Sequence, residues 1–280
     1  MSINIDAVFV TWFDTETKRA YGDSRILAGK CYEKLNVVGS VATFRKKGKG
    51  LASKHNAGSE VTYMNTAFTP VTATLEDWEA FDSADKFDAK KINFTEVTEL
   101  AEVAGDAIGL RMDQIVIDAI TDGRNTSDSS YTVGTVGAAL TVASLRAAVK
   151  RLNKNGVEKK DRYFMHNADQ LDNLLATTEV TSSDFNTIKA LVNAEVPGFL
   201  GLEFVGIADR QEGGLPNPGA TSVRGYVYHK RAVGYAQGMG METEMTWIPK
   251  ERAWMVGGEF SAAAVVIDDK GIVSVQSLTT

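Results

Sequence analysis

The stretch Asn93–Gly123 constrains the fold most, because it has the pattern of one very long amphipathic helix. Asn93 and Glu96 have the spacing of a capping box, and Gly123 is a residue at which helices commonly end. At 1.5 Å per residue the helix would be about 40 Å long. Its apolar residues recur at the spacing of one buried stripe: Val97, Leu100, Ala101, Ala104, Ala107, Ile108, Ile115 and Ala119. We therefore expect the other elements to be arranged along this helix.

Two glycines, Gly105 and Gly109, lie one turn apart inside the predicted helix. Each weakens a helix by up to about 1 kcal/mol relative to alanine. One interpretation is that another segment of backbone packs closely there, and the other is that the helix bends there. The sequence favours close packing, and both residues are kept as candidates for flexure of the helix.

Composition and charge exclude several classes of protein. The 280 residues are 44% hydrophobic and 24% charged, as in folded globular proteins. The first residues lack the basic and apolar regions of a secretion signal, and no apolar run approaches the roughly 18 residues of a membrane span. The single Cys31 predicts folding in a reducing cytosol. A net charge of −6 argues against tight nucleic-acid binding as the main task.

Residues 35–75 have the pattern of a long β-hairpin with a basic tip. Valine- and threonine-rich segments flank a flexible stretch, and strands of about ten residues would reach roughly 33 Å. The basic residues of the tip are Arg45, Lys46, Lys47, Lys49 and Lys54. A lone hairpin is marginally stable in water, so a neighbouring copy of the chain is the natural surface for it. The glycine spacing of a phosphate-binding loop is absent, and the tip has no interleaved aromatic residues for stacking on nucleic acid.

An acidic segment follows the hairpin. Its carboxylates are Glu76, Asp77, Glu79, Asp82, Asp85 and Asp88. A basic tip and an acidic base are compatible with charge pairing between subunits. They are equally compatible with two solvated charge clusters, because exposed ion pairs contribute little.

The remaining segments indicate an arm, an α/β region and a set of closing strands. Residues 1–34, with a short strand at Ala7–Phe13, have the texture of an extended arm. Residues 137–235 alternate helices and strands, and residues 209–222 form a loop rich in proline and glycine that we expect at the surface. The strands expected after Ala232 are Met241–Ile248, Arg252–Val256, Glu259–Ile267 and Ile272–Val275, the last two joined by a tight turn.

We find no pattern of catalytic or metal-binding residues. His55, His166 and His229 lack metal-ligand spacing, and the latter two end strand-like runs, which favours structural positions. Glu242 and Glu244 share one face of a predicted strand, for which a solvated face is the simplest interpretation. We therefore expect a protein that is not an enzyme and holds no cofactor.

The order of these parts resembles the layout of the major capsid proteins of tailed bacteriophages, of the Hong Kong 97 type. RYFMHNADQLDNLL, SSDFNTIKALV and GFLGLEFVGI resemble the strand–helix–helix–strand of that family's axial domain, and AVVIDDKGIVSVQ resembles its closing hairpin. The resemblance implies an α+β fold. Its expected divisions are an arm (1–34), an extended loop (35–92), a peripheral domain with the spine helix (93–136 and 236–280) and an axial domain (137–235).

The resemblance also implies a function. The chain would assemble with itself into hexamers and pentamers of an icosahedral shell that encloses double-stranded DNA, contacted weakly and non-specifically. Scaffolding, portal and decoration proteins would be further partners, and the protein would reside in the virion after synthesis in the host cytoplasm. An encapsulin-like bacterial compartment with the same fold is an alternative, and a soluble α/β enzyme is another. The subunit-contact candidates are Arg45, Lys46, Lys47, Lys49, Lys54, Glu76, Asp77, Glu79 and Asp82.

Overall fold

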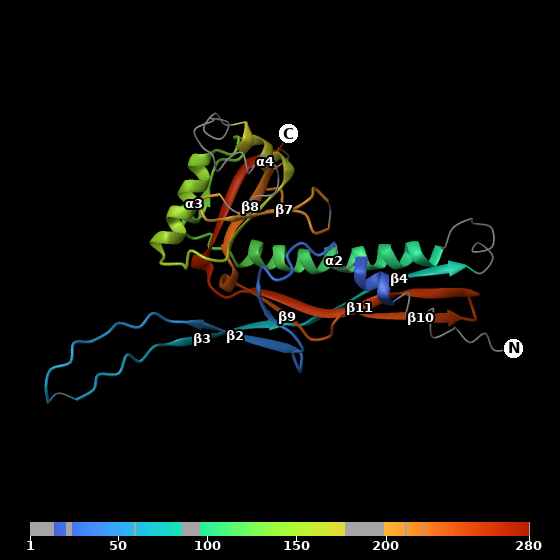
Figure 1. The fold of residues 1–280 in the computed structure, drawn as a ribbon, viewed down its shortest axis with the longest axis horizontal. Coiled ribbons are helices and arrows are strands. Elements are labelled where there is room, and N and C mark those ends of the chain that lie inside the picture. Colours follow the sequence, from blue (N-terminus) through green and yellow to red (C-terminus); the bar gives the residue numbers. More distant parts are fainter. Residues whose placement is uncertain are drawn as a thin grey trace.

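The computed structural model is elongated, with a long helix lying along a sheet (Figure 1). An α/β region sits over one end of that helix, and a hairpin projects beyond the same end. The structure describes residues 14–20, 24–58, 60–85, 96–176, 199–210, 212–219 and 221–279. The strand expected at Ala7–Phe13 and the helix expected after Ser183 lie outside these ranges.

Helix α2 spans Glu96–Gly123 and confirms the predicted long helix over that range. The cap expected at Asn93 lies outside the described residues. The buried stripe is wider than expected, because Met112, Val116, Ile117 and Ile120 are also buried, while Ile115 and Ala119 are half-buried. The C-terminal half of α2 packs against both sheets, so two of its faces are covered there.

The first sheet lies beneath α2. Its strand order is β1 (Tyr32–Lys34), β9 (Val233–Gln237), β11 (Ala253–Val266) and β10 (Glu242–Ile248), and β4 (Glu76–Asp85) pairs along the other side of β11. The late strands therefore cover the helix stripe as expected. The sequence interpretation missed β9. It also missed β4, because the many acidic residues of this strand obscure the alternation of apolar and polar side chains. It also split β11 in two at the glycines of residues 257–258, which are buried inside one continuous strand.

The second sheet belongs to the α/β region. Its order is β5 (Thr132–Val133), β12 (Ile272–Leu278), β8 (Ser222–His229), β6 (Arg162–His166) and β7 (Glu203–Gly206). Helices α3 (Val142–Lys154) and α4 (Ala168–Leu175) belong to the same region. The side chains of Thr141 and Asn167 cap these helices by accepting hydrogen bonds from Ser144 N and Gln170 N. The predicted helices and strands of this region are thus confirmed within the described residues.

The chain crosses from one sheet to the other at two neighbouring connections. Strand β8 continues through the short helix η3 (Lys230–Ala232) into β9, and β11 continues through η4 (Asp269–Gly271) into β12. These connections touch, since Ile267 N donates to Ala232 O at 2.8 Å. The expected closing hairpin is therefore wrong: the tight turn exists, but β12 pairs with β8 instead of β11.

Residues 24–34 pack against their own chain, contrary to an extended arm. Ile26 N and Leu27 N donate to the two carboxylate oxygens of Asp113 on α2, at 2.8 and 3.1 Å. Leu27 and Cys31 are buried in the main core. The hydrogen-bonding capacity of one buried carboxylate thus fixes a segment whose own sequence has no strong periodic pattern.

The loop at residues 209–222 was expected at the surface, and its middle is instead buried. Residues 213–215 lie against α2, where Gly213 N donates to Gln114 Oε1 at 2.8 Å. Arg111 of α2 pairs with Glu212 at 3.6 Å and stacks on the Trp78 ring at 3.6 Å. The glycines let the loop backbone approach the helix closely. In the sequence, the same glycines were interpreted as signs of a surface turn.

Candidate subunit-contact site

The projecting hairpin is the part of the molecule that its own chain leaves most exposed. Strands β2 (Val41–Lys47) and β3 (Phe68–Thr74) pair in antiparallel register, from Val41 opposite Thr74 to Lys47 opposite Phe68. This confirms the predicted hairpin, with seven-residue strands rather than ten. Beyond them, the described residues from 48 to 65 are all exposed. The end of the hairpin extends well away from both sheets (Figure 1).

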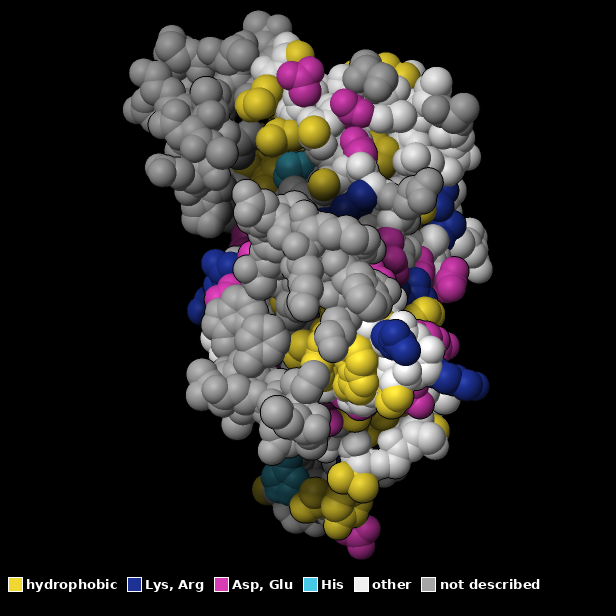
Figure 2. All heavy atoms as spheres, turned by 90° about the vertical axis from the view of Figure 1, so that its right-hand side faces the viewer, with side chains coloured by type: hydrophobic (Ala, Val, Ile, Leu, Met, Phe, Trp, Pro, Cys, Tyr) yellow, Lys and Arg dark blue, Asp and Glu magenta, His cyan; other side chains and the backbone are white. Residues whose placement is uncertain are grey.

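Large apolar side chains cluster on this exposed tip. Leu51 is 86% exposed and Tyr63 is 79% exposed. Val61, Met64 and Phe68 are also more than half exposed. In Figure 2 the lowest part of the molecule is this tip, and hydrophobic side chains gather on it. Contiguous exposed apolar groups on a projecting segment are typical of a surface that another molecule covers.

The root of the hairpin is firmly packed. Phe44 and Ala42 on β2 and Ala73 on β3 are buried against Ala236 of β9 and Ala263 of β11. Successive residues of a strand point to opposite faces of the sheet. Ala262, next to Ala263, belongs to the core that includes α2, so the cluster around Ala263 lies on the other face of the first sheet. The hairpin thus combines a fixed root with an uncovered tip.

An ion-pair junction ties the hairpin to the crossing point of the two sheets. Lys46 Nζ lies 2.9 Å from both Asp268 Oδ1 and Asp269 Oδ1. Asn125, just after α2, donates to Asp269 Oδ2 at 3.0 Å. Partial burial acts to raise the pKa of Asp269, but the hydrogen bonds and charge of Lys46 outweigh it, so this pKa lies below its usual value. Lys49 Nζ donates to Asn155 O, at the end of α3, at 2.8 Å.

The basic candidates therefore divide into two groups. Lys46 and Lys49 are engaged within their own chain and serve the root of the hairpin. Arg45, Lys47 and Lys54 are exposed, and among the described residues no carboxylate forms an ion pair with them. The sequence could not separate these groups, because Asp268 and Asp269 lie more than 200 residues away.

The acidic candidates lie on a strand rather than at a loose hairpin base. Glu76, Asp77, Glu79 and Asp82 are exposed on β4, which forms one edge of the first sheet. They share this sheet with Glu242 and Glu244 of β10 and with Glu259 of β11. Sequence reasoning did not connect Glu259 with these residues, because only the strand register shows that it lies opposite Glu242 and Glu79.

The helix glycines meet another segment at one position. A side-chain carbon on Gly109 would collide with Ser24 and come within 3.3 Å of Arg25 N. Close packing therefore accounts for Gly109. Gly105 is buried, and α2 runs through both glycines without interruption. Flexure at Gly105 and Gly109 remains a prediction.

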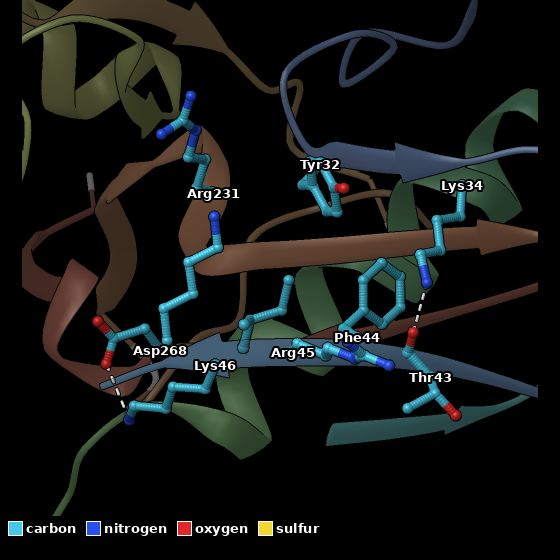
Figure 3. Close-up of a pocket in the computed structure, with 10 residues that line it drawn as sticks. Tyr32, Lys34, Thr43, Phe44, Arg45, Lys46, Arg231 and Asp268 are labelled. Atoms are coloured by element: carbon cyan, nitrogen blue, oxygen red, sulfur yellow. Dashed lines mark hydrogen bonds and ion pairs between the residues drawn. The ribbon is translucent and has the colours of Figure 1, made fainter. Parts of the chain in front are cut away.

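A cationic groove of about 770 Å³ lies beside the hairpin root (Figure 3). Tyr32 and Lys34 of β1 line one wall, Arg231 closes one end, and β2 forms the other wall. The rings of Tyr32 and Phe44 meet edge to face, with centroids 6.0 Å apart, and Lys34 donates to Thr43 O. The groove adds positive charge to the same side of the molecule as the basic residues of the hairpin.

The described residues contain no cluster of three or more side chains suited to a metal ion. His166 and His229 are buried, and the Nδ1 atom of each makes a hydrogen bond to backbone, with Asn167 O at 2.9 Å and Arg231 N at 3.1 Å. Burial lowers the pKa of both imidazoles. No helix in the described residues is long and apolar enough to cross a membrane.

The fold described above, with its projecting hairpin, is that of phage capsid structural proteins. The family model described as phage capsid protein matches residues 5–278, and the chain belongs to this family. No curated protein sequence matches it.

Solved structures show the same fold at low sequence identity. The capsid of cyanophage P-SCSP1u matches with a TM-score of 0.70 and 16% identity, over 91% of this chain and 89% of that one. The acid-stable capsid of Helicobacter pylori bacteriophage KHP30 matches with a TM-score of 0.70 and 12% identity, over 99% and 93%. A virus-like particle from Pyrococcus furiosus matches with a TM-score of 0.62 and 9% identity, over 95% and 98%.

Proposed function

We propose that this chain is the subunit of an icosahedral tailed-phage capsid, assembling into hexamers and pentamers that enclose double-stranded DNA. The observation that carries the proposal is the hairpin, whose root is buried in its own chain while its apolar tip is uncovered. Such a tip is unfavourable in water unless a neighbouring copy covers it. Membership of the phage capsid protein family supports the same reading.

The proposed mechanism is geometric. In the Hong Kong 97 layout, α2 and the first sheet correspond to the peripheral domain, the second sheet with α3 and α4 to the axial domain, and the hairpin to the extended loop. Sheet pairing suggests changes to the sequence-based division: β9 belongs with the peripheral domain, and β5 and β12 belong with the axial domain. Hexamers and pentamers differ in curvature, which small changes in the angle of the hairpin accommodate.

The proposed partners follow from this role. The chain contacts itself first, and scaffolding, portal and decoration proteins are further partners of the assembled shell. The negative net charge suits weak, non-specific contact with packaged DNA rather than tight binding. The protein works without a cofactor or catalysis, and it resides in the virion after synthesis in the host cytoplasm.

Electron microscopy of the purified protein, alone and coexpressed with its scaffolding protein, tests this proposal. Closed shells of uniform diameter with pentameric vertices are the expected result. Exclusively small species under all these conditions would contradict it.

An encapsulin-like compartment is the second candidate, favoured by the match to the Pyrococcus furiosus virus-like particle over nearly the whole of both chains. The nuclease-resistant content of shells isolated from the native source separates the two. Genome-length double-stranded DNA is expected for a phage capsid, whereas a protein cargo without DNA would favour the compartment.

A further inference from the structure

The groove beside the hairpin root gathers positive charge around a volume of about 770 Å³ (Figure 3). Sites for small molecules usually have volumes of about 300–1,000 Å³. Half of the residues that line the groove are basic, and its one carboxylate is that of Asp268. The basic residues are Lys34, Arg45, Lys46, Lys47 and Arg231. Because Lys46 neutralises Asp268 at 2.9 Å, the charge of the other four is left for a ligand.

The lysine on the β1 wall is held in place without a carboxylate. Lys34 Nζ donates to Thr43 O and lies 5.0 Å from the centre of the Phe44 ring. Both contacts fix the position of the ammonium group and keep its charge. On the opposite wall Arg45 and Lys47 are exposed, and no carboxylate of the described residues forms an ion pair with either. The groove therefore presents positive charge from both walls.

One edge of β2 adds backbone N–H groups to the same groove. Gly48 N donates to Ala67 O on the β3 side at 2.9 Å, whereas Thr43 O accepts its hydrogen bond from the β1 side. Backbone groups alternate between the two edges of a strand, so the N–H groups of Arg45 and Lys47 point to the same side as Thr43 O. In the part of the chain that the structure describes, β2 pairs with β3 alone, which leaves these two N–H groups without a sheet partner.

This combination of groups favours a compact anion over an extended peptide. Guanidinium, ammonium and backbone N–H groups all donate hydrogen bonds, and phosphate oxygens accept them. A peptide that extended the sheet would need a longer row of free backbone groups, since strands usually have about five or six residues. Within the groove the edge of β2 offers only Arg45 and Lys47 intact, because Thr43 O is already occupied.

The shape of the groove limits the length of the ligand. Arg231 closes one end (Figure 3). It pairs with Glu158 at 3.7 Å, but both side chains are more than half exposed, so the pair is weak and the guanidinium can exchange it for a ligand. A short chain of phosphates can end at this guanidinium, whereas a long nucleic-acid strand would have to leave the groove at both ends.

We propose that this groove is a binding site for a soluble oligophosphate, such as inorganic tripolyphosphate or the triphosphate group of a nucleotide. The phosphates lie along β2, where Arg45 and Lys47 supply charge and backbone donors. Lys34 contacts them from the β1 wall, and Arg231 binds the terminal phosphate. The site lies within one chain, so the inference goes beyond the proposed function and holds or fails independently of it.

Calorimetric titration of the purified subunit with tripolyphosphate tests the proposal. At about 0.15 M salt, where exposed charges more than about 8 Å apart are largely screened, the wild type should bind at a single saturable site. The variant with Arg45→Gln, Lys47→Gln and Arg231→Gln should bind at least about tenfold more weakly, because it loses three charge-assisted contacts. Its melting temperature should stay close to that of the wild type, since all three side chains are exposed.

A matched control separates the groove from net charge. Arg146→Gln, Lys150→Gln and Arg252→Gln remove three exposed basic groups elsewhere on the subunit, and this variant should bind tripolyphosphate as the wild type does. Equal weakening in the two triple variants would show that only net charge matters and would overturn the proposal. Absence of saturable binding to the wild type would overturn it as well.

Two further probes show whether another class of molecule occupies the groove. A short oligothymidylate has the charge of a single nucleic-acid strand, and an oligoglutamate has that of an acidic peptide. Both should bind more weakly than tripolyphosphate. Tighter binding of either probe would overturn the proposal by assigning the groove to nucleic acid or to a peptide.

Amine labelling locates the ligand directly. Saturating tripolyphosphate should slow the acetylation of Lys34 and Lys47 at least about fivefold, because the phosphates hold both ammonium groups. The exposed Lys150 on α3 should react at the same rate with and without the ligand. Unchanged rates at Lys34 and Lys47 would contradict the proposed site even if tripolyphosphate binds elsewhere on the subunit.

Discussion

Lys46, on the hairpin, lies 2.9 Å from Asp269, at the turn where β11 leaves the first sheet for the second. This ion pair joins three parts of the molecule, because Asn125 after α2 binds the same carboxylate. Together with the apolar cluster around Phe44, the pair holds the hairpin root against the body of the subunit. It therefore connects the internal packing of the subunit with the projecting hairpin.

Replacing Lys46 should loosen the hairpin root without unfolding the subunit. For Lys46→Met we expect a loss of about 0.5–1 kcal/mol in the free energy of unfolding, because the pair is about a third exposed and solvent screens it. Urea denaturation of the isolated subunit measures this loss. Lys47→Met, at the exposed neighbouring position, should have less than about half that effect, and equal losses at the two positions would show that the junction contributes nothing specific.

Removing the carboxylate of Asp113 should destabilise the subunit strongly. Asp113→Ala leaves Ile26 N and Leu27 N without their acceptors in a buried place, which should cost about 3 kcal/mol. The amides of residues 26 and 27 should also exchange faster with solvent. Asp106→Ala, at an exposed position of the same helix, should change stability by less than about 0.5 kcal/mol. A small effect at Asp113 would mean that water satisfies these amides and that residues 24–34 are weakly held.

The same carboxylate predicts a pH dependence with a definite sign. Burial raises the pKa of Asp113, and the two backbone hydrogen bonds and the nearby arginines only partly oppose it. A carboxyl whose pKa rises on folding holds its proton more tightly in the folded protein. The wild type should therefore gain stability relative to Asp113→Asn as pH falls through the raised pKa towards about 3.9, the value in an unfolded chain. A difference that stays constant with pH would contradict this assignment.

Gly109→Ala should destabilise the protein, although alanine favours helices. The added carbon would collide with Ser24, so we expect a net loss of about 1–2 kcal/mol despite a gain of about 1 kcal/mol in helix propensity. In a Ser24→Gly background the collision is relieved, and the same substitution should cost less. Thermal melting of the four chains measures this coupling; strictly additive effects would indicate that Ser24 does not pack against Gly109.

Elements with strong local patterns could be predicted from the sequence. The helix α2, the hairpin and the α/β region follow from periodicity, capping residues and turns within short stretches. The pairing of β12 with β8 could not be predicted, because nothing within the tight turn indicates that the chain changes sheets there. The packing of residues 24–34 depends on Asp113, more than 80 residues away, so no local pattern reveals it.

The surroundings of the candidate contact residues were predictable to a similar degree. Exposed Arg45, Lys47 and Lys54 lie on the projecting hairpin as expected, whereas Lys46 turned out to serve the junction. The acidic residues that lie side by side on β4, β11 and β10 could not be grouped from the sequence, because their alignment depends on the register of the three strands. Of these strands, β4 was missed and β11 was split in two. Charge clusters are visible in a sequence, but their partners are set by tertiary structure.

Hydrogen–deuterium exchange of the hairpin tip, compared between free subunits and assembled shells, tests the central claim that sister copies cover it. The backbone amides of residues 49–58 and 60–65 should exchange rapidly in the subunit, where they are exposed, and become protected at least about tenfold in the shell. Equally rapid exchange in both states would show that assembly leaves the tip uncovered, and the account of the hairpin as a contact arm would be wrong.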